Sequence, residues 1–225
     1  MMFHAFESQA AAAEVLARRV AADLAAVIGR RGHAVLAVSG GRSPVPFLQA
    51  LSAEVLDWSR VSVTLVDERV VAPGHADSNA GLVRDHLLQG GAADATFLPL
   101  VSTAANVDAE LAQAAAQWQT PDVVVLGMGD DGHTASLFPD AANLAAGLDP
   151  ANPAALLAVV PPEAPHTRIS MTLAEILRSG KLYLAIAGDN KRRVLEQASR
   201  TLSAAQPVSH LLQQTENPLH VYWAA

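Results

Sequence analysis

The chain has 225 residues, of which 51% are hydrophobic and 16% charged, and it contains no cysteine. The missing thiols exclude disulfides, thiolate nucleophiles and thiolate zinc sites, and a formal net charge of −7 argues against a nucleic-acid partner. No apolar run approaches the about 18 residues that cross a bilayer, so no membrane partner is expected. The first ten residues lack the basic and apolar regions of a secretory signal, and we expect a cytoplasmic protein with one domain over residues 1–225.

Apolar periodicity predicts alternating helices and strands. Apolar residues three and four apart indicate a first helix from about Ser8 to Ile28, with Ser8 as its N-cap and Gly29 or Gly32 as its end. The apolar run 33–38 then indicates a buried strand that enters a glycine turn. Further elements are expected as helices at 44–56, 79–88, 104–118 and 190–199 and as strands at 61–66, 122–127, 181–188 and 219–224. Strands without polar alternation, separated by helices, predict an α/β fold with a mostly parallel sheet flanked by helices.

Residues 39–44, directly after the first predicted strand, are Ser-Gly-Gly-Arg-Ser-Pro. Gly40 and Gly41 allow backbone N–H groups to approach an anion, and Ser39 and Ser43 add hydroxyl donors. Many such turns bind nothing, and this one is neither a Walker A loop nor a dinucleotide fingerprint. It indicates an anion site only in combination with other groups.

Three charges, Asp67, Glu68 and Arg69, follow the strand predicted at 61–66. They form either a solvated turn with a surface ion pair or part of a site at the carboxyl edge of the sheet. In a site, Arg69 offers a planar fork for phosphate or carboxylate. Asp67 would accept substrate hydroxyls or orient another side chain.

The most informative segment is Gly-Met-Gly-Asp-Asp-Gly-His, residues 127–133, after the strand predicted at 122–127. Imidazole accepts and releases protons near neutral pH, so His133 beside Asp130 and Asp131 is a candidate general base. The alternative is a structural histidine that hydrogen-bonds the backbone. One histidine with flanking acids is a poor zinc site, and we expect no metal. The remaining histidines that we considered as ligands stand in separate sequence contexts: His75, His86, His166 and His210.

Two further cations follow later in the chain. Arg168 opens an apolar alternating stretch, and Lys191 begins a predicted helix after a strand end, where anions are favoured. Taken alone, each of these two residues is better explained as a surface cation. Together with the glycine turn at 39–44 and Arg69, they predict a phosphate cradle.

Four segments together resemble the 6-phosphogluconolactonases, the lactonase branch of the glucosamine-6-phosphate deaminase/isomerase superfamily. They are residues 39–44, 67–69 with 77–88, 127–139 and 165–172. The resemblance implies a modified Rossmann-like (NagB/RpiA-like) fold and hydrolysis of 6-phospho-D-glucono-1,5-lactone in the oxidative pentose phosphate pathway, with no cofactor. The deaminases typically continue after their histidine with Phe-Asn-Glu-Pro and carry Tyr at the position of Arg69. Here residues 136–139 are Ser-Leu-Phe-Pro, which favours the lactonase.

The resemblance also implies roles for the site residues. His133 would take a proton from water, and Asp131 or Asp67 would orient the imidazole. Arg69 and backbone N–H groups would stabilise the oxyanion. The phosphate would lie on the loop from Ser39 to Ser43 with Arg168 and Lys191. Arg42, where the family often has Ser or Thr, adds charge or points to solvent.

The sequence leaves three alternatives open. The chain could be a sugar-phosphate deaminase or isomerase, or a non-catalytic sugar-phosphate sensor. A sensor usually carries an additional partner-binding segment, whereas the residues before Ser39 fit one helix and one strand. A nucleophilic Ser39 or Ser136 is less favoured, because neither lies in a Gly-x-Ser-x-Gly elbow. Either a monomer or a small homo-oligomer fits the sequence.

Overall fold

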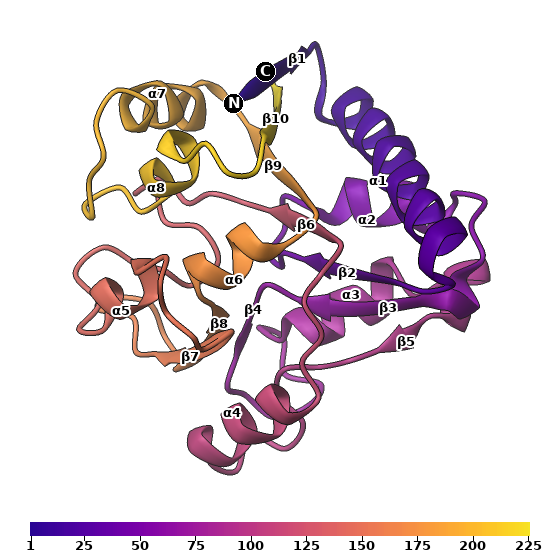
Figure 1. Cartoon of the computed structure of the whole chain (residues 1–225), viewed down its shortest axis with the longest axis horizontal. Coiled ribbons are helices and arrows are strands. Elements are labelled where there is room, and N and C mark those ends of the chain that lie inside the picture. Colours follow the sequence, from indigo (N-terminus) through magenta and orange to yellow (C-terminus); the bar gives the residue numbers. More distant parts are fainter.

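The computed structural model describes residues 1–225 and is built on a seven-stranded, all-parallel sheet (Figure 1). Its strands, from one edge to the other, are β1 (Met2–Phe6), β10 (Leu219–Ala224), β9 (Lys181–Ala187), β6 (Val123–Leu126), β2 (Ala34–Val38), β3 (Val61–Leu65) and β5 (Thr96–Phe97). The central strands β2, β3 and β6 are buried along their whole length. A strand covered on both faces needs apolar residues at every position, which explains the uninterrupted apolar runs. The predicted mostly parallel α/β fold is confirmed.

A second, three-stranded antiparallel sheet was not predicted from the sequence. It contains β4 (Asp67–Arg69), β8 (Arg168–Met171) and β7 (Leu156–Val159). The register sets Arg69 opposite Arg168 and Asp67 opposite Ser170. The three charges at 67–69 are therefore paired strand residues and not a solvated turn.

The helices cover the parallel sheet and connect its strands. They are α1 (Gln9–Arg31), α2 (Val45–Ser52), α3 (Asn79–His86), α4 (Val107–Ala116), α5 (Leu144–Leu148), α6 (Leu173–Arg178), α7 (Asp189–Ala198) and α8 (Val208–Gln213), with short 3₁₀ turns at Trp58–Arg60 and Gly90–Asp94. The long helix α1 packs against α2, β2 and β10. Half of its eight buried residues are alanines, whose small side chains allow close approach to these neighbours. None of the helices combines the length and the apolar character that crossing a membrane requires.

The ends of α1 follow the predicted capping. Ser8 accepts a hydrogen bond from the Ala11 N–H at 3.2 Å, and Gly32 ends the helix with φ 80°. Glycine adopts this left-handed backbone conformation without strain because it has no Cβ. Gly32, and not Gly29, is therefore the end of this helix.

The first strand, β1, corrects the expectation of one helix and one strand before Ser39. Residues 2–6 pair in parallel with β10, so the two ends of the chain lie side by side (Figure 1). β1 is an edge strand, and three of its five residues are exposed. Its sequence consequently lacks the continuous apolar character that identified the central strands.

Candidate active site

A cavity of about 280 Å³ opens at the carboxyl ends of four parallel strands. Its walls include residues at the ends of β2, β6, β9 and β10 and the loops that follow β2 and β6. At β2 the strand order reverses, with β3 on one side and β6 on the other. Ligands of open parallel sheets bind at such a switch point, and the cavity is therefore the candidate active site. The predicted site residues that line it are Ser39, Gly40, Gly41, Arg42, Ser43, Asp67, Arg69, His133 and Lys191.

The loop after β2 keeps its own backbone donors free. The N–H groups of residues 40–43 donate to no acceptor within the protein, and all four residues line the cavity. Ser39, by contrast, fastens the loop to β6: its N–H donates to the Val125 carbonyl, and its Oγ accepts from the Gly127 N–H, both at 2.9 Å. The result is a fixed loop with four unpaired donors, a preorganised arrangement for an anion.

Gly40 is required by its packing against a buried amide. A Cβ at this position would lie 1.9 Å from Asn79 Oδ1. Asn79, at the first turn of α3, donates from Nδ2 to the Asp67 carbonyl at 2.9 Å and lines the same cavity. This side chain thus connects the glycine loop to β4.

The loop after β6 holds an imidazole against a carboxylate. His133 Nδ1 lies 2.6 Å from Asp131 Oδ1, which also accepts from the His133 N–H at 3.1 Å. His133 lines the cavity while Asp131 does not, so the acid stands behind the ring. No protein group pairs with His133 Nε2. Of the two acids considered as partners, the geometry brings Asp131 to the imidazole.

Gly129 makes room for this pair. A Cβ on Gly129 would lie 2.2 Å from His133 Cε1 and 2.6 Å from Asp131 Oδ1. The loop is closed by hydrogen bonds from the Gly129 N–H to the His133 carbonyl and from Thr134 Oγ1 to the Gly127 carbonyl, both at 2.9 Å. Asp130 lies outside the cavity lining and accepts from Asn190 Nδ2 at 2.9 Å.

Asp67 and Glu68 support the site from β4. Asp67 Oδ2 accepts from the buried Ser136 hydroxyl at 2.6 Å. Glu68 is 1% exposed, and its carboxylate accepts from the N–H groups of Asn79 and Ala80, at 2.8 and 2.7 Å, in the first turn of α3. Burial raises the pKa of Glu68 above its usual value, against the opposing effect of these donors. Glu68 therefore docks α3 onto β4 and places Asn79 in the cavity wall.

Three cations line the cavity: Arg42, Arg69 and Lys191. Arg69 Nη1 donates to the Asp77 carbonyl at 2.6 Å, which fixes its guanidinium. Lys191, in the first turn of α7, takes part in none of the ion pairs of the protein. Arg42 is exposed at the rim. Positive charge is thus concentrated here although the chain is acidic overall.

Arg168 does not line the cavity. It is 5% exposed, donates from Nη2 to the Pro165 carbonyl at 3.1 Å, and stands opposite Arg69 in the antiparallel sheet. Burial, followed by the charge of Arg69, lowers the pKa of Arg168. Phe138 is its link to the site, with the ring 6.0 Å from Arg168 Cζ and 4.4 Å from the His133 ring. A direct role for Arg168 at the phosphate stays a prediction without a contact to support it.

Sequence reasoning assigned no site role to several residues that the fold brings here. They are Asn79, Gln9 and Tyr222, which line the cavity. Asn79 lies within the segment that carried the family resemblance, and its place next to the N-cap Ser78 was the available signal. Tyr222 reaches the cavity because β10 pairs with β9, and Gln9, at the start of α1, donates from Nε2 to the Ser43 carbonyl at 2.9 Å.

Fold and cavity together define an α/β protein with a candidate small-molecule site at the switch point of a parallel sheet. The family described as glucosamine-6-phosphate isomerases/6-phosphogluconolactonase matches residues 7–223. The chain is 43% identical to a 6-phosphogluconolactonase of Neisseria meningitidis, over 99% of each chain, and 46% identical to one of Rhizobium meliloti, over 98% and 97%. The crystal structure of a 6-phosphogluconolactonase from Shewanella baltica superposes with a TM-score of 0.95 at 39% identity, covering 100% of this chain and 98% of that one.

The chain therefore belongs to the glucosamine-6-phosphate isomerase/6-phosphogluconolactonase family, and the resemblance noted from its loops is confirmed. These relatives are named 6-phosphogluconolactonases, and the chain aligns with them over nearly their full length. The chain is an enzyme of the lactone-hydrolysing branch.

Proposed function

We propose that the chain hydrolyses 6-phospho-D-glucono-1,5-lactone to 6-phospho-D-gluconate in the oxidative pentose phosphate pathway, with His133 as the general base. The observation that supports this most is the 2.6 Å contact between His133 Nδ1 and Asp131 in a cavity that also presents unpaired backbone donors. Similarity to lactonases over nearly the full length of the chain supports the same reaction.

The proposed chemistry begins at His133 Nε2. Asp131 accepts the hydrogen bond from Nδ1–H and so holds the lone pair of Nε2 toward the cavity. Nε2 takes a proton from water while the water oxygen bonds to the lactone carbonyl carbon. The bond from that carbon to the ring oxygen then breaks, and the imidazolium returns the proton to the departing oxygen.

Two groups of donors would serve the two ends of the substrate. Arg69, fixed by the Asp77 carbonyl, would stabilise the negative charge that develops on the carbonyl oxygen. The phosphate would lie on the N–H groups of residues 40–43 with Lys191 beside it. Binding at this remote end positions the lactone for attack by water.

In this proposal Asp67 has a supporting role, because its carboxylate already binds the Ser136 hydroxyl. That contact also argues against Ser136 as a nucleophile, since the hydroxyl is fully buried. Ser39 Oγ is likewise engaged by the Gly127 N–H. Activated water remains the nucleophile that the geometry supports best. The proposal includes a cytoplasmic location and a monomer or small homo-oligomer.

The test is a coupled assay in which the lactone is generated enzymatically from glucose 6-phosphate. Its disappearance is compared with the spontaneous rate, and we expect clear acceleration that is proportional to enzyme. Ammonia release from glucosamine 6-phosphate would identify a deaminase instead. Calorimetric binding of sugar phosphate without turnover of either compound would identify a sensor.

A further inference from the structure

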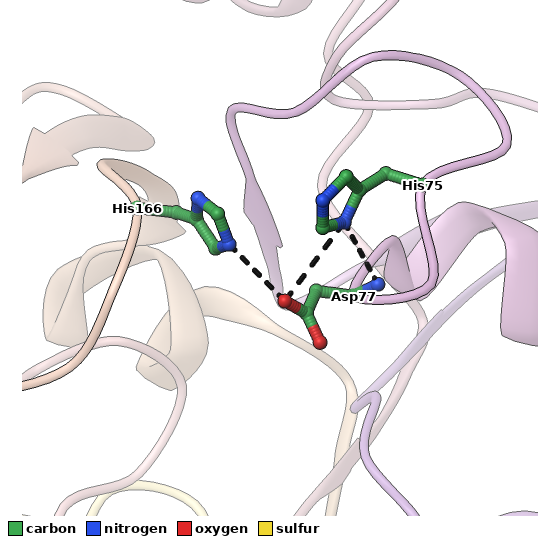
Figure 2. A group of neighbouring side chains, drawn as sticks. All are labelled: His75, Asp77 and His166. Atoms are coloured by element: carbon green, nitrogen blue, oxygen red, sulfur yellow. Dashed lines mark hydrogen bonds and ion pairs between the residues drawn. The ribbon is translucent and has the colours of Figure 1, made fainter.

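Two histidines and an aspartate, from two segments that are far apart in the sequence, meet outside the cavity. His75 and Asp77 lie between β4 and α3, and His166 lies between β7 and β8 (Figure 2). His166 Nε2 is 3.1 Å from Asp77 Oδ2, and His75 Nδ1 is 3.8 Å from the same oxygen. One ligand atom from each of the three residues lies within 4.8 Å of the others. This corrects the expectation that His75 and His166 stand in separate contexts.

We propose that His75, Asp77 and His166 bind a divalent transition-metal ion, with Zn²⁺ as the reference ion. Two imidazoles and one carboxylate are a ligand set that binds zinc and related first-row transition metals, with a fourth position left for water. Mg²⁺ and Ca²⁺ prefer oxygen ligands and do not match this set.

The two histidine–aspartate distances are close to those that a metal requires, whereas the two imidazoles are held only to within 4.8 Å of each other. Ligand bonds of about 2.0–2.1 Å in a tetrahedral site place the ligand atoms about 3.3 Å apart. The two histidine–aspartate distances, 3.1 and 3.8 Å, lie on either side of this value. Binding requires His75 to move inward and to give up the hydrogen bond that its Nδ1 accepts from the Asp77 N–H at 3.1 Å. Its side chain is 44% exposed and therefore has room to move.

A bound ion would connect the two loops that hold the paired arginines. Arg69 donates to the Asp77 carbonyl, and Arg168 donates to the carbonyl of Pro165, directly before His166. The left-handed backbone of His166, φ 69°, is uncommon for a residue with a Cβ. We therefore expect the metal to fasten residues 70–78 to residues 160–167 and to stabilise the folded chain.

The experiment is calorimetric titration of the full chain with zinc chloride in the absence of sugar phosphate. Its outcome is then independent of the reaction at the cavity. We expect one site that each of the substitutions His75→Ala, Asp77→Asn and His166→Ala weakens by about tenfold or more. Zinc should also raise the melting temperature of the unsubstituted chain and not that of these variants.

Two histidine variants serve as controls. His86→Ala removes a histidine that contacts Gln49 and is not part of the cluster, and His133→Ala removes the other histidine–aspartate pair. Both should keep the site. Loss of zinc binding in His133→Ala with retention in His166→Ala would overturn the proposal, as would equal competition by Mg²⁺. Circular dichroism of each variant shows that a lost site does not reflect a lost fold.

Discussion

The two glycine loops of the cavity follow neighbouring parallel strands, yet they use their backbone differently. The loop after β2 leaves the N–H groups of residues 40–43 unpaired. The loop after β6 instead closes on itself, with the Gly129 N–H bound to the His133 carbonyl and the Gly132 N–H bound to the Gly129 carbonyl. The first loop can therefore hold an anion, while the second holds one of its own side chains.

This difference shows that glycine has two separate uses at the same sheet edge. In the first loop Gly40 gives space to Asn79, and the residues with unpaired amides line the cavity. In the second loop Gly129 gives space to the imidazole and its carboxylate. We expect changes in the second loop to affect turnover and changes around the first loop to affect binding.

The largest effect is expected at His133. Replacement by Asn keeps a polar side chain but removes the proton acceptor, so kcat should fall by at least about 100-fold with a smaller change in KM. Steady-state kinetics in the coupled assay, with the spontaneous rate subtracted, measures both constants. Unchanged turnover in His133→Asn would remove this residue from the chemistry.

Gly129→Ala tests whether the second loop acts by placing the imidazole. The added Cβ would overlap His133 and Asp131, and a displacement of about 1 Å can cost up to about 100-fold in rate. We expect kcat to fall by about tenfold or more while KM changes little.

Gly127→Ala is the matched control for this prediction. Its Cβ would meet only Ser39 at 3.9 Å, an ordinary contact, and kcat should stay near that of the unsubstituted chain. Equal losses in both variants would indicate general damage to the loop and would contradict the positioning role of Gly129.

Lys191→Ala tests the anion-binding side of the comparison. Loss of a charge-assisted contact to phosphate should raise KM by about tenfold, with a smaller change in kcat. Arg192→Ala is the control, because this neighbour on α7 pairs with Glu196 at 2.9 Å and does not line the cavity. A flat KM in Lys191→Ala would place the phosphate elsewhere.

The smallest effect is expected from metal removal. The proposed reaction uses the imidazole, water and hydrogen-bond donors of the protein but no metal, so dialysis against a chelator should leave kcat unchanged within error. Activity lost to the chelator and restored by Zn²⁺ would show that turnover depends on a metal. The same experiment on His75→Ala would separate a metal used at the cavity from an ion bound by His75, Asp77 and His166.

Much of the fold could be predicted because its signals are local. The apolar runs at 33–38 and 122–127 became β2 and β6, and the glycine turns that follow them border the cavity as expected. The antiparallel sheet was missed because β4 has only three residues, all charged, and because burial of Arg168 depends on its partner strands. Glu68 was missed for a related reason: its role depends on the N-terminus of a helix eleven residues away.

The sequence by itself determined the parallel α/β architecture and the loops that carry the site, because apolar periodicity and consecutive glycines act over a few residues. Only the tertiary structure decided which cations line the cavity: Lys191 belongs to its lining, whereas Arg168 is buried opposite Arg69 in the antiparallel sheet. It also decided that His75 and His166 meet. These outcomes depend on strand register and on packing between segments about 90 residues apart, which no local pattern encodes.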